Sequence, residues 1–207
     1  MLSKKAMIQG TPENIKARLD IAYDVLKLIE AKKVLVRRRR SYVVAPPSVL
    51  NLIRSNPLWD LKKVFTTAKE PCEVCALGAM FVADIKRNSN YSCSKTVERQ
   101  AIYQVVYGEP EKEITQDDGA KERLANVFTH TELSDIESSF EGWNNSLSDL
   151  PEHFRFAEYS DAKLTYLMYN IIYNNGYFKC DNWPTSFYIP PVRTVKKPAS
   201  KCLRQTK

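Results

Sequence analysis

The ten-residue run from Cys72 to Phe81, Cys-Glu-Val-Cys-Ala-Leu-Gly-Ala-Met-Phe, constrains the fold of this chain more than any other segment. Its apolar residues recur with helical spacing and predict a helix from Cys72 to about Arg87. Small residues at Ala76, Gly78 and Ala79 would let the backbone of this helix approach a neighbouring element closely. We therefore expect the helix to pack tightly within the core.

Helical periodicity recurs along the rest of the chain. Thr11 and Pro12 form a helix start. Apolar residues that follow at spacings of three and four predict an amphipathic helix that ends near residues 31–33. Its expected buried stripe is Ile15, Leu19, Ala22, Leu26 and Ile29. Short helices are predicted over 48–54, 94–108 and 118–127. Thr129 and Glu132 form a capping box before a helix at 131–141. A last helix starts at Ser160 and ends at Asn174-Asn175-Gly176.

Two β-prone stretches interrupt this helical pattern. Val34-Leu35-Val36 and Tyr42-Val43-Val44 flank four consecutive arginines, Arg37 to Arg40. Both a hairpin and one irregular extended segment fit this arrangement, which Pro46-Pro47 ends. The stretch therefore predicts a short β-prone arm on a helical protein.

Charge is distributed unevenly over the 207 residues. Residues 1–40 carry 11 basic and 4 acidic side chains, a net charge of +7, and residues 185–207 carry 6 basic and none acidic, a net charge of +6. The remaining residues carry 14 basic and 20 acidic side chains, a net charge of −6. An acidic body with two basic ends predicts that the ends contact an acidic partner: nucleic acid, a membrane surface or the body of another copy.

Composition places the chain in the globular class, because 43% of its residues are hydrophobic and 11% are aromatic. No apolar run approaches the roughly 18 residues that span a bilayer. The basic N-terminus lacks the apolar stretch of a signal peptide, so we expect a protein that is not secreted and keeps reduced thiols.

These features together predict a mainly α-helical fold, with one compact domain of about six helices, a short β-prone arm and an extended C-terminal tail. Residues 1–61 form an N-terminal helix and basic arm in this prediction. Residues 62–184 form the acidic helical body, and residues 185–207 form the basic extended tail.

The arginine run is the strongest electrostatic signal. Arginines in an extended stretch point to alternate faces, so that some of them must seek anions. The predicted binding residues are Arg37, Arg38, Arg39, Arg40 and Tyr42, together with Arg193, Lys196 and Lys197 in the tail. Both an acidic protein surface and a phosphate backbone fit this pattern.

The cysteines allow three interpretations. Cys72 and Cys75 have the spacing of half a zinc site, for which Cys93, Cys180, His130 and His153 could supply further ligands. A thiol at a helix start is also a candidate nucleophile. The favoured interpretation is structural: a helix start whose Cys75 packs in the core. We accordingly expect no cofactor, with zinc at Cys72 and Cys75 as the alternative.

Three motifs resemble small proteins encoded by bacteriophages. They are the Cys-x-x-Cys-Ala-Leu-Gly-Ala run from Cys72, the Leu-x-x-Ile-Glu-x-x-Phe-Glu-Gly-Trp run from Leu133, and the run from Leu167 to Phe178 that contains Asn170-Ile171-Ile172. Their order and spacing over residues 62–183 also resemble that group. The resemblance implies a phage accessory protein in the cytoplasm of an infected bacterium, or a component of the phage particle. It implies no catalytic residues.

The favoured function is therefore a non-enzymatic one, in which the basic arms bind a host or phage macromolecule or another copy of the chain. The first alternative is a nucleic-acid-binding protein that uses Arg37 to Arg40 and the basic tail. The second is a thiol or zinc-dependent enzyme at Cys72 and Cys75.

Overall fold

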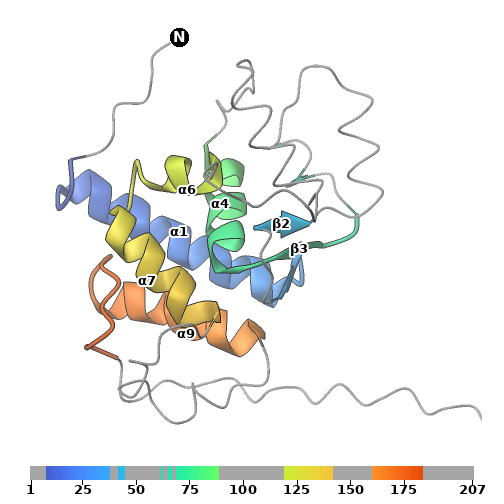
Figure 1. Cartoon of the computed structure of the whole chain (residues 1–207). Helices are drawn as coiled ribbons and strands as arrows, with labels where there is room; N and C mark the ends of the chain where they lie inside the picture. The colour runs from blue at the N-terminus through green and yellow to red at the C-terminus, as the bar shows by residue number, and fades with distance from the viewer. Residues whose placement is uncertain are drawn as a thin grey trace, which may run out of the picture.

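A computed structural model describes residues 8–37, 42–44, 62, 65–66, 69–88, 119–141 and 160–183 of the chain. This part is mostly helical with one small sheet (Figure 1). Its elements are α1 (Pro12–Glu30), β1 (Val34–Val36), β2 (Val43–Val44), β3 (Cys72–Val74), α4 (Ala76–Arg87), α6 (Gly119–Leu124), α7 (His130–Glu141) and α9 (Ser160–Tyr173). The prediction of a mainly helical fold is confirmed for these residues, which contain five helices where about six were expected for the whole chain. The helices predicted over 48–54 and 94–108, and the tail at 185–207, lie outside the described residues.

Helix α1 runs through the middle of the helical body (Figure 1). It packs against α9 on one side and α4 on another, while α7 contacts both α4 and α9. Helix α6 covers α4 and α7, and the small sheet lies at the C-terminal end of α1. None of the helices in the described part of the chain is long and apolar enough to cross a membrane.

Helix α1 begins as predicted, because the Thr11 hydroxyl accepts a hydrogen bond from the Asn14 backbone N–H at 3.3 Å. The predicted buried stripe is wrong by about one residue. The buried side chains are Asn14, Arg18, Ile21, Ala22, Val25 and Leu28. The two polar residues at the start of this stripe have their own partners in the core, so burial does not follow apolar character alone.

The sheet corrects the prediction for the β-prone arm. Strand β3 lies in the centre, parallel to β1 and antiparallel to β2, so the two strands that flank the arginine run do not pair with each other. Cys72 to Val74 was predicted to be helical and is instead this central strand. The physical reason is period-two burial: Cys72 and Val74 face the core while Glu73 lies between them, half-buried.

Helix α4 therefore begins at Ala76, with Cys75 as its N-cap. The Cys75 Sγ accepts a hydrogen bond from the Gly78 backbone N–H at 3.4 Å. Gly78 lies directly against the backbone of the segment before β2, and a Cβ built on it would be 1.7 Å from the Tyr42 carbonyl oxygen. The predicted close approach at Gly78 is thus confirmed, and the neighbour is an extended segment rather than a helix.

Helices α7 and α9 have the predicted ends. Glu132 accepts hydrogen bonds from the backbone N–H and hydroxyl of Thr129, both at 2.9 Å, and the Thr129 hydroxyl accepts one from the Glu132 N–H at 3.1 Å. This is the expected capping box. Helix α9 ends with Asn175 and Gly176 in the left-handed region, at φ values of 53° and 93°. The Gly176 N–H then reaches back to the Ile171 carbonyl at 2.8 Å.

Arg18, a buried arginine in α1, links the start of α7 and the end of α9 to α1. The Arg18 guanidinium donates from Nε to the Val127 carbonyl at 2.9 Å and from Nη1 to Glu132 at 2.7 Å and the Gly176 carbonyl at 3.2 Å. Its Nη2 donates to Glu132 at 3.0 Å and to Gln9. The rings of Phe128 and Tyr177 lie 5.0 and 4.9 Å from its central carbon. One side chain thus joins α1 to two segments that are far apart in the sequence, residues 127–132 and 176–177.

The contact at Gly78 predicts that Gly78→Ala destabilises the protein. A methyl group at this position meets backbone atoms that cannot rotate away, so we expect a loss of about 1–3 kcal/mol in the free energy of unfolding. Without the contact, alanine in a helix would instead stabilise by about 1 kcal/mol. Urea unfolding of the variant distinguishes the two cases by the sign of the change in the free energy of unfolding. An increase in this free energy would contradict the close approach.

The Arg18 contacts predict a strong coupling between Arg18 and Glu132. Arg18→Met should cost about 3–5 kcal/mol, because it leaves the Glu132 carboxylate with neither its charge partner nor two of its donors. The double variant Arg18→Met, Glu132→Gln should lose less than the sum of the two single losses. Urea unfolding of all three variants measures this. Lys16→Met on the exposed face of α1 is the matched control, and strict additivity would contradict the coupling.

Candidate functional site

The segment that joins β1 to β2, residues 37–42, is anchored at both of its ends to the end of β3. The Arg37 backbone N–H donates to the Val74 carbonyl at 2.8 Å, and the Cys75 backbone N–H donates to the Tyr42 carbonyl at 3.1 Å. These bonds follow from the register, in which Val36 is paired with Val74 on one side and Val43 with Val74 on the other. Arg38, Arg39 and Arg40 lie outside the described residues, as do Arg193, Lys196 and Lys197 in the tail.

Arg37, the first residue of the run, is exposed and lies near a carboxylate of the body. Burial raises the pKa of Asp161 in α9, while the positive charge of Arg37 and a hydrogen bond from the Val36 backbone N–H act in the opposite direction. Asp161 thus accepts a hydrogen bond at the outer edge of β1. Unpaired strand edges invite pairing with other chains, so this carboxylate protects the edge. The sequence carries no signal for the contact, because Asp161 and Arg37 are far apart in the chain.

Tyr42, the last predicted binding residue in this segment, is half-buried and packs against the core. Its carbonyl is held by Cys75 and lies over Gly78 at the first turn of α4. The structure therefore brings Arg37 and Tyr42 to the same end of β3. It gives Tyr42 an anchoring contact that the sequence pattern did not indicate.

The two thiols of the Cys72–Cys75 motif are buried. Burial raises the pKa of Cys72 to about 11. Burial also raises the pKa of Cys75 to about 12, and the nearby carboxylates Glu141 and Glu137 add to this effect. Both side chains are therefore neutral thiols near pH 7. Nucleophilic attack requires the thiolate, so these environments suit packing and capping rather than nucleophilic chemistry.

The possible further ligands do not join these thiols in the described part of the chain. No group of three or more His, Cys, Asp or Glu side chains among the described residues could hold a metal ion. His130 is exposed at the first turn of α7, and Cys180 is exposed after α9. Cys93 and His153 lie outside the described residues.

The segment that follows α9 is held in place by an asparagine cluster. Asn170 donates to the carbonyls of Lys179 and Asn182 at 2.8 and 3.1 Å, and it accepts from the Lys179 N–H at 2.9 Å. Asn174 and Asn182 exchange hydrogen bonds at 3.0 and 2.7 Å. Phe178 and Trp183 are buried, with their rings 5.8 Å apart in an edge-to-face arrangement. Much of the aromatic content near the C-terminal end of the body therefore serves packing.

Comparison with known proteins returned no match. No family model fits the chain, and neither a curated protein nor a solved structure is significantly similar to it.

The thiol environments predict a clear order of alkylation by iodoacetamide at pH 8. Cys180 is exposed and should react in the folded protein, whereas Cys72 and Cys75 should react only after unfolding. Peptide mass spectrometry resolves each site, and labelling in denaturant shows that every thiol can react. Rapid modification of Cys75 in the folded protein would contradict its role as a buried helix cap.

Proposed function

We propose that this chain is a non-enzymatic binding protein that engages an acidic macromolecule through its basic segment at residues 37–40. The observation that carries the proposal is that the chain is held to β3 on both sides of the arginine run, at Arg37 and at Tyr42. A basic run between two points held to a folded core loses less conformational freedom on binding than a free tail would lose. The segment is thus suited to contact with a surface.

Charge supports a protein partner. The body between the basic ends has a net charge of −6, so a second copy offers the acidic surface that the arginines require. Arg193, Lys196 and Lys197 add a second basic region for the same partner. Both self-assembly and binding of a foreign acidic protein follow from this arrangement.

The resemblance to phage-encoded small proteins supports a phage setting for this function. The chain would act in the cytoplasm of an infected bacterium, where it binds a host or phage protein, or it would form part of the phage particle. Virion co-purification separates the two roles, because a particle component remains with purified virions and an intracellular effector does not.

A catalytic role at Cys72 and Cys75 has less support than binding. Their raised pKa values keep both thiols protonated, and Cys75 is engaged as the cap of α4. A nucleophilic cysteine needs the opposite environment, with a lowered pKa and access to solvent.

The proposal predicts that the triple variant Arg38→Ala, Arg39→Ala, Arg40→Ala weakens binding to a poly-glutamate peptide about tenfold at low salt. This variant retains Arg37, so it leaves the contact with Asp161 in place. Fluorescence anisotropy with the labelled peptide measures the affinity. The matched control removes three exposed lysines elsewhere, by Lys16→Gln, Lys27→Gln and Lys179→Gln.

Two results would overturn this proposal. If the triple variant and the control bind the peptide equally, the arginine segment is not the contact. If a random-sequence oligonucleotide binds more tightly than the peptide, with a steep salt dependence that the triple variant loses, nucleic acid is the partner. Light scattering of the native protein at low and high salt then shows whether a second copy is the acidic surface.

A further inference from the structure

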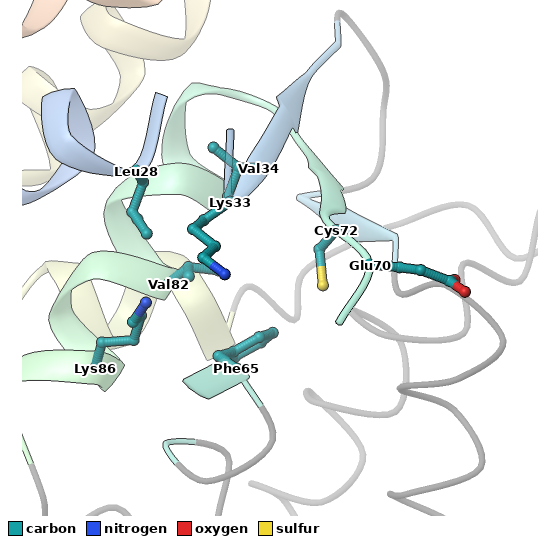
Figure 2. A pocket seen from close by; sticks show the side chains of 8 residues that line it. All are labelled: Leu28, Lys33, Val34, Phe65, Glu70, Cys72, Val82 and Lys86. Carbon is teal, nitrogen blue, oxygen red and sulfur yellow. The ribbon is translucent and has the colours of Figure 1, made fainter. Parts of the chain in front are cut away.

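The hollow between the C-terminal end of α1, the sheet and α4 is too small for a ligand (Figure 2). Its apolar lining, which includes Leu28, Val34 and Val82, is buried. The hollow has room for about one water molecule. The outer surface of the helical body, and the exposed side of α9 in particular, offers more to a partner.

The exposed side of α9 carries no charge beyond Asp161. This helix lies at the edge of the helical body (Figure 1). Between Asp161 and the end of the helix, the residues that are not buried are Ala162, Thr165, Tyr169, Ile172 and Tyr173. Lys163, the one charged residue in this stretch, is buried and donates to the Phe140 carbonyl at 3.3 Å. Because 27% of the chain is charged, an exposed helix side without charge needs an explanation.

These exposed residues have the spacing of a coiled-coil seam. Ala162, Thr165, Tyr169 and Ile172 follow one another at intervals of three, four and three residues, which places them on one stripe of the helix. Tyr173 lies beside Ile172 at the end of the stripe and is 58% exposed. The other side of α9 packs on α1 and α7. Helix α9 therefore has a second face with the pattern of a packing surface.

Helix α1 contributes a further exposed aromatic ring near this face. The two helices run antiparallel: a Cβ on Gly176, after α9, would lie 3.3 Å from the Ile15 carbonyl oxygen near the start of α1, while Asp161 at the start of α9 accepts a hydrogen bond from Val36, beyond the end of α1. Tyr23, two turns after Ile15, is 48% exposed and lies level with the middle of α9. Aromatic residues are enriched and charged residues depleted at the centre of protein interfaces, whereas a phosphate backbone requires cations.

We propose that the outer face of α9 is a contact between two copies of this chain, paired antiparallel about a two-fold axis. The stripe has small residues, Ala162 and Thr165, in its first half and large ones, Tyr169 and Ile172, in its second half. In an antiparallel pair the two halves oppose each other, so each layer joins a small residue with a large one. A second copy supplies this complement by symmetry.

The ends of the face are complementary in charge as well. Asp161 lies at the N-terminal end of α9, and Lys16 follows Ile15, which packs at the C-terminal end. Antiparallel pairing brings Asp161 of one copy near Lys16 of the other. The stripe from Ala162 to Tyr173 is only about 16 Å long, so we expect a weak and reversible dimer. This face is separate from the basic segment at residues 37–40, so the dimer does not depend on the proposed function.

Sedimentation velocity of the full chain at rising protein concentration tests this proposal. The wild type should shift from monomer to dimer, and the dimer should persist at high salt, because apolar contacts are not screened by ions. Tyr173→Ser should weaken dimerisation about tenfold, since it removes an aromatic ring from each side of the interface. Tyr173→Phe retains the ring and is the matched control that should dimerise like the wild type. Both variants should bind poly-glutamate normally, which separates this dimer from the arginine segment.

An exchange of side-chain size tests the antiparallel pairing. Ala162 of one copy would lie against Ile172 and Tyr173 of the other, so Ala162→Tyr should weaken dimerisation about tenfold by overpacking. Adding Tyr173→Ala to this variant should restore the dimer. Thermal unfolding followed by circular dichroism shows whether each variant is folded.

Four results would overturn the proposal. They are a wild type that stays monomeric at every concentration, a dimer that dissociates in high salt, a dimer that Tyr173→Ser leaves unchanged, and a double variant that dimerises no better than Ala162→Tyr alone. The first result would also apply if the face binds a foreign protein instead of a second copy.

Discussion

The Arg18 guanidinium is the interaction on which the rest of the helical body depends. An arginine has five N–H donors, and the five hydrogen bonds of Arg18 use all of them while two aromatic rings cover its faces. Its partners fix the turn before α7, the first turn of α7 through Glu132, and the turn after α9. Replacing Arg18 and Glu132 together by apolar side chains of similar size need not reduce stability, because burying charge is itself costly. Removing one partner is costly, since the other then remains buried and unpaired. The contact therefore specifies how the helices meet more than it adds to their net stability.

Local signals in the sequence predicted the ends of helices well. The capping residues Thr11, Thr129 and Glu132, and the Asn-Asn-Gly stop after α9, act through bonds to residues a few positions away, so that neighbouring sequence is sufficient. The buried face of α1 was predicted about one residue out of position for the opposite reason. Asn14 donates to the Val127 carbonyl at 2.7 Å across 113 residues of chain, and no local pattern marks a polar residue that will have such a partner. Polar burial is decided by tertiary contacts.

The same distinction explains the error in the secondary structure predicted for Cys72 to Val74. Residues 72–74 carry apolar positions that fit both a helix start and a short strand, and the presence of strands on both sides decides the outcome. Once Cys72 is in a strand and Cys75 caps α4, the two thiols no longer lie one helical turn apart, and both are buried. The arginine segment could be recognised from composition alone. The anchoring of its ends on β3 could not, because it depends on which strands become neighbours.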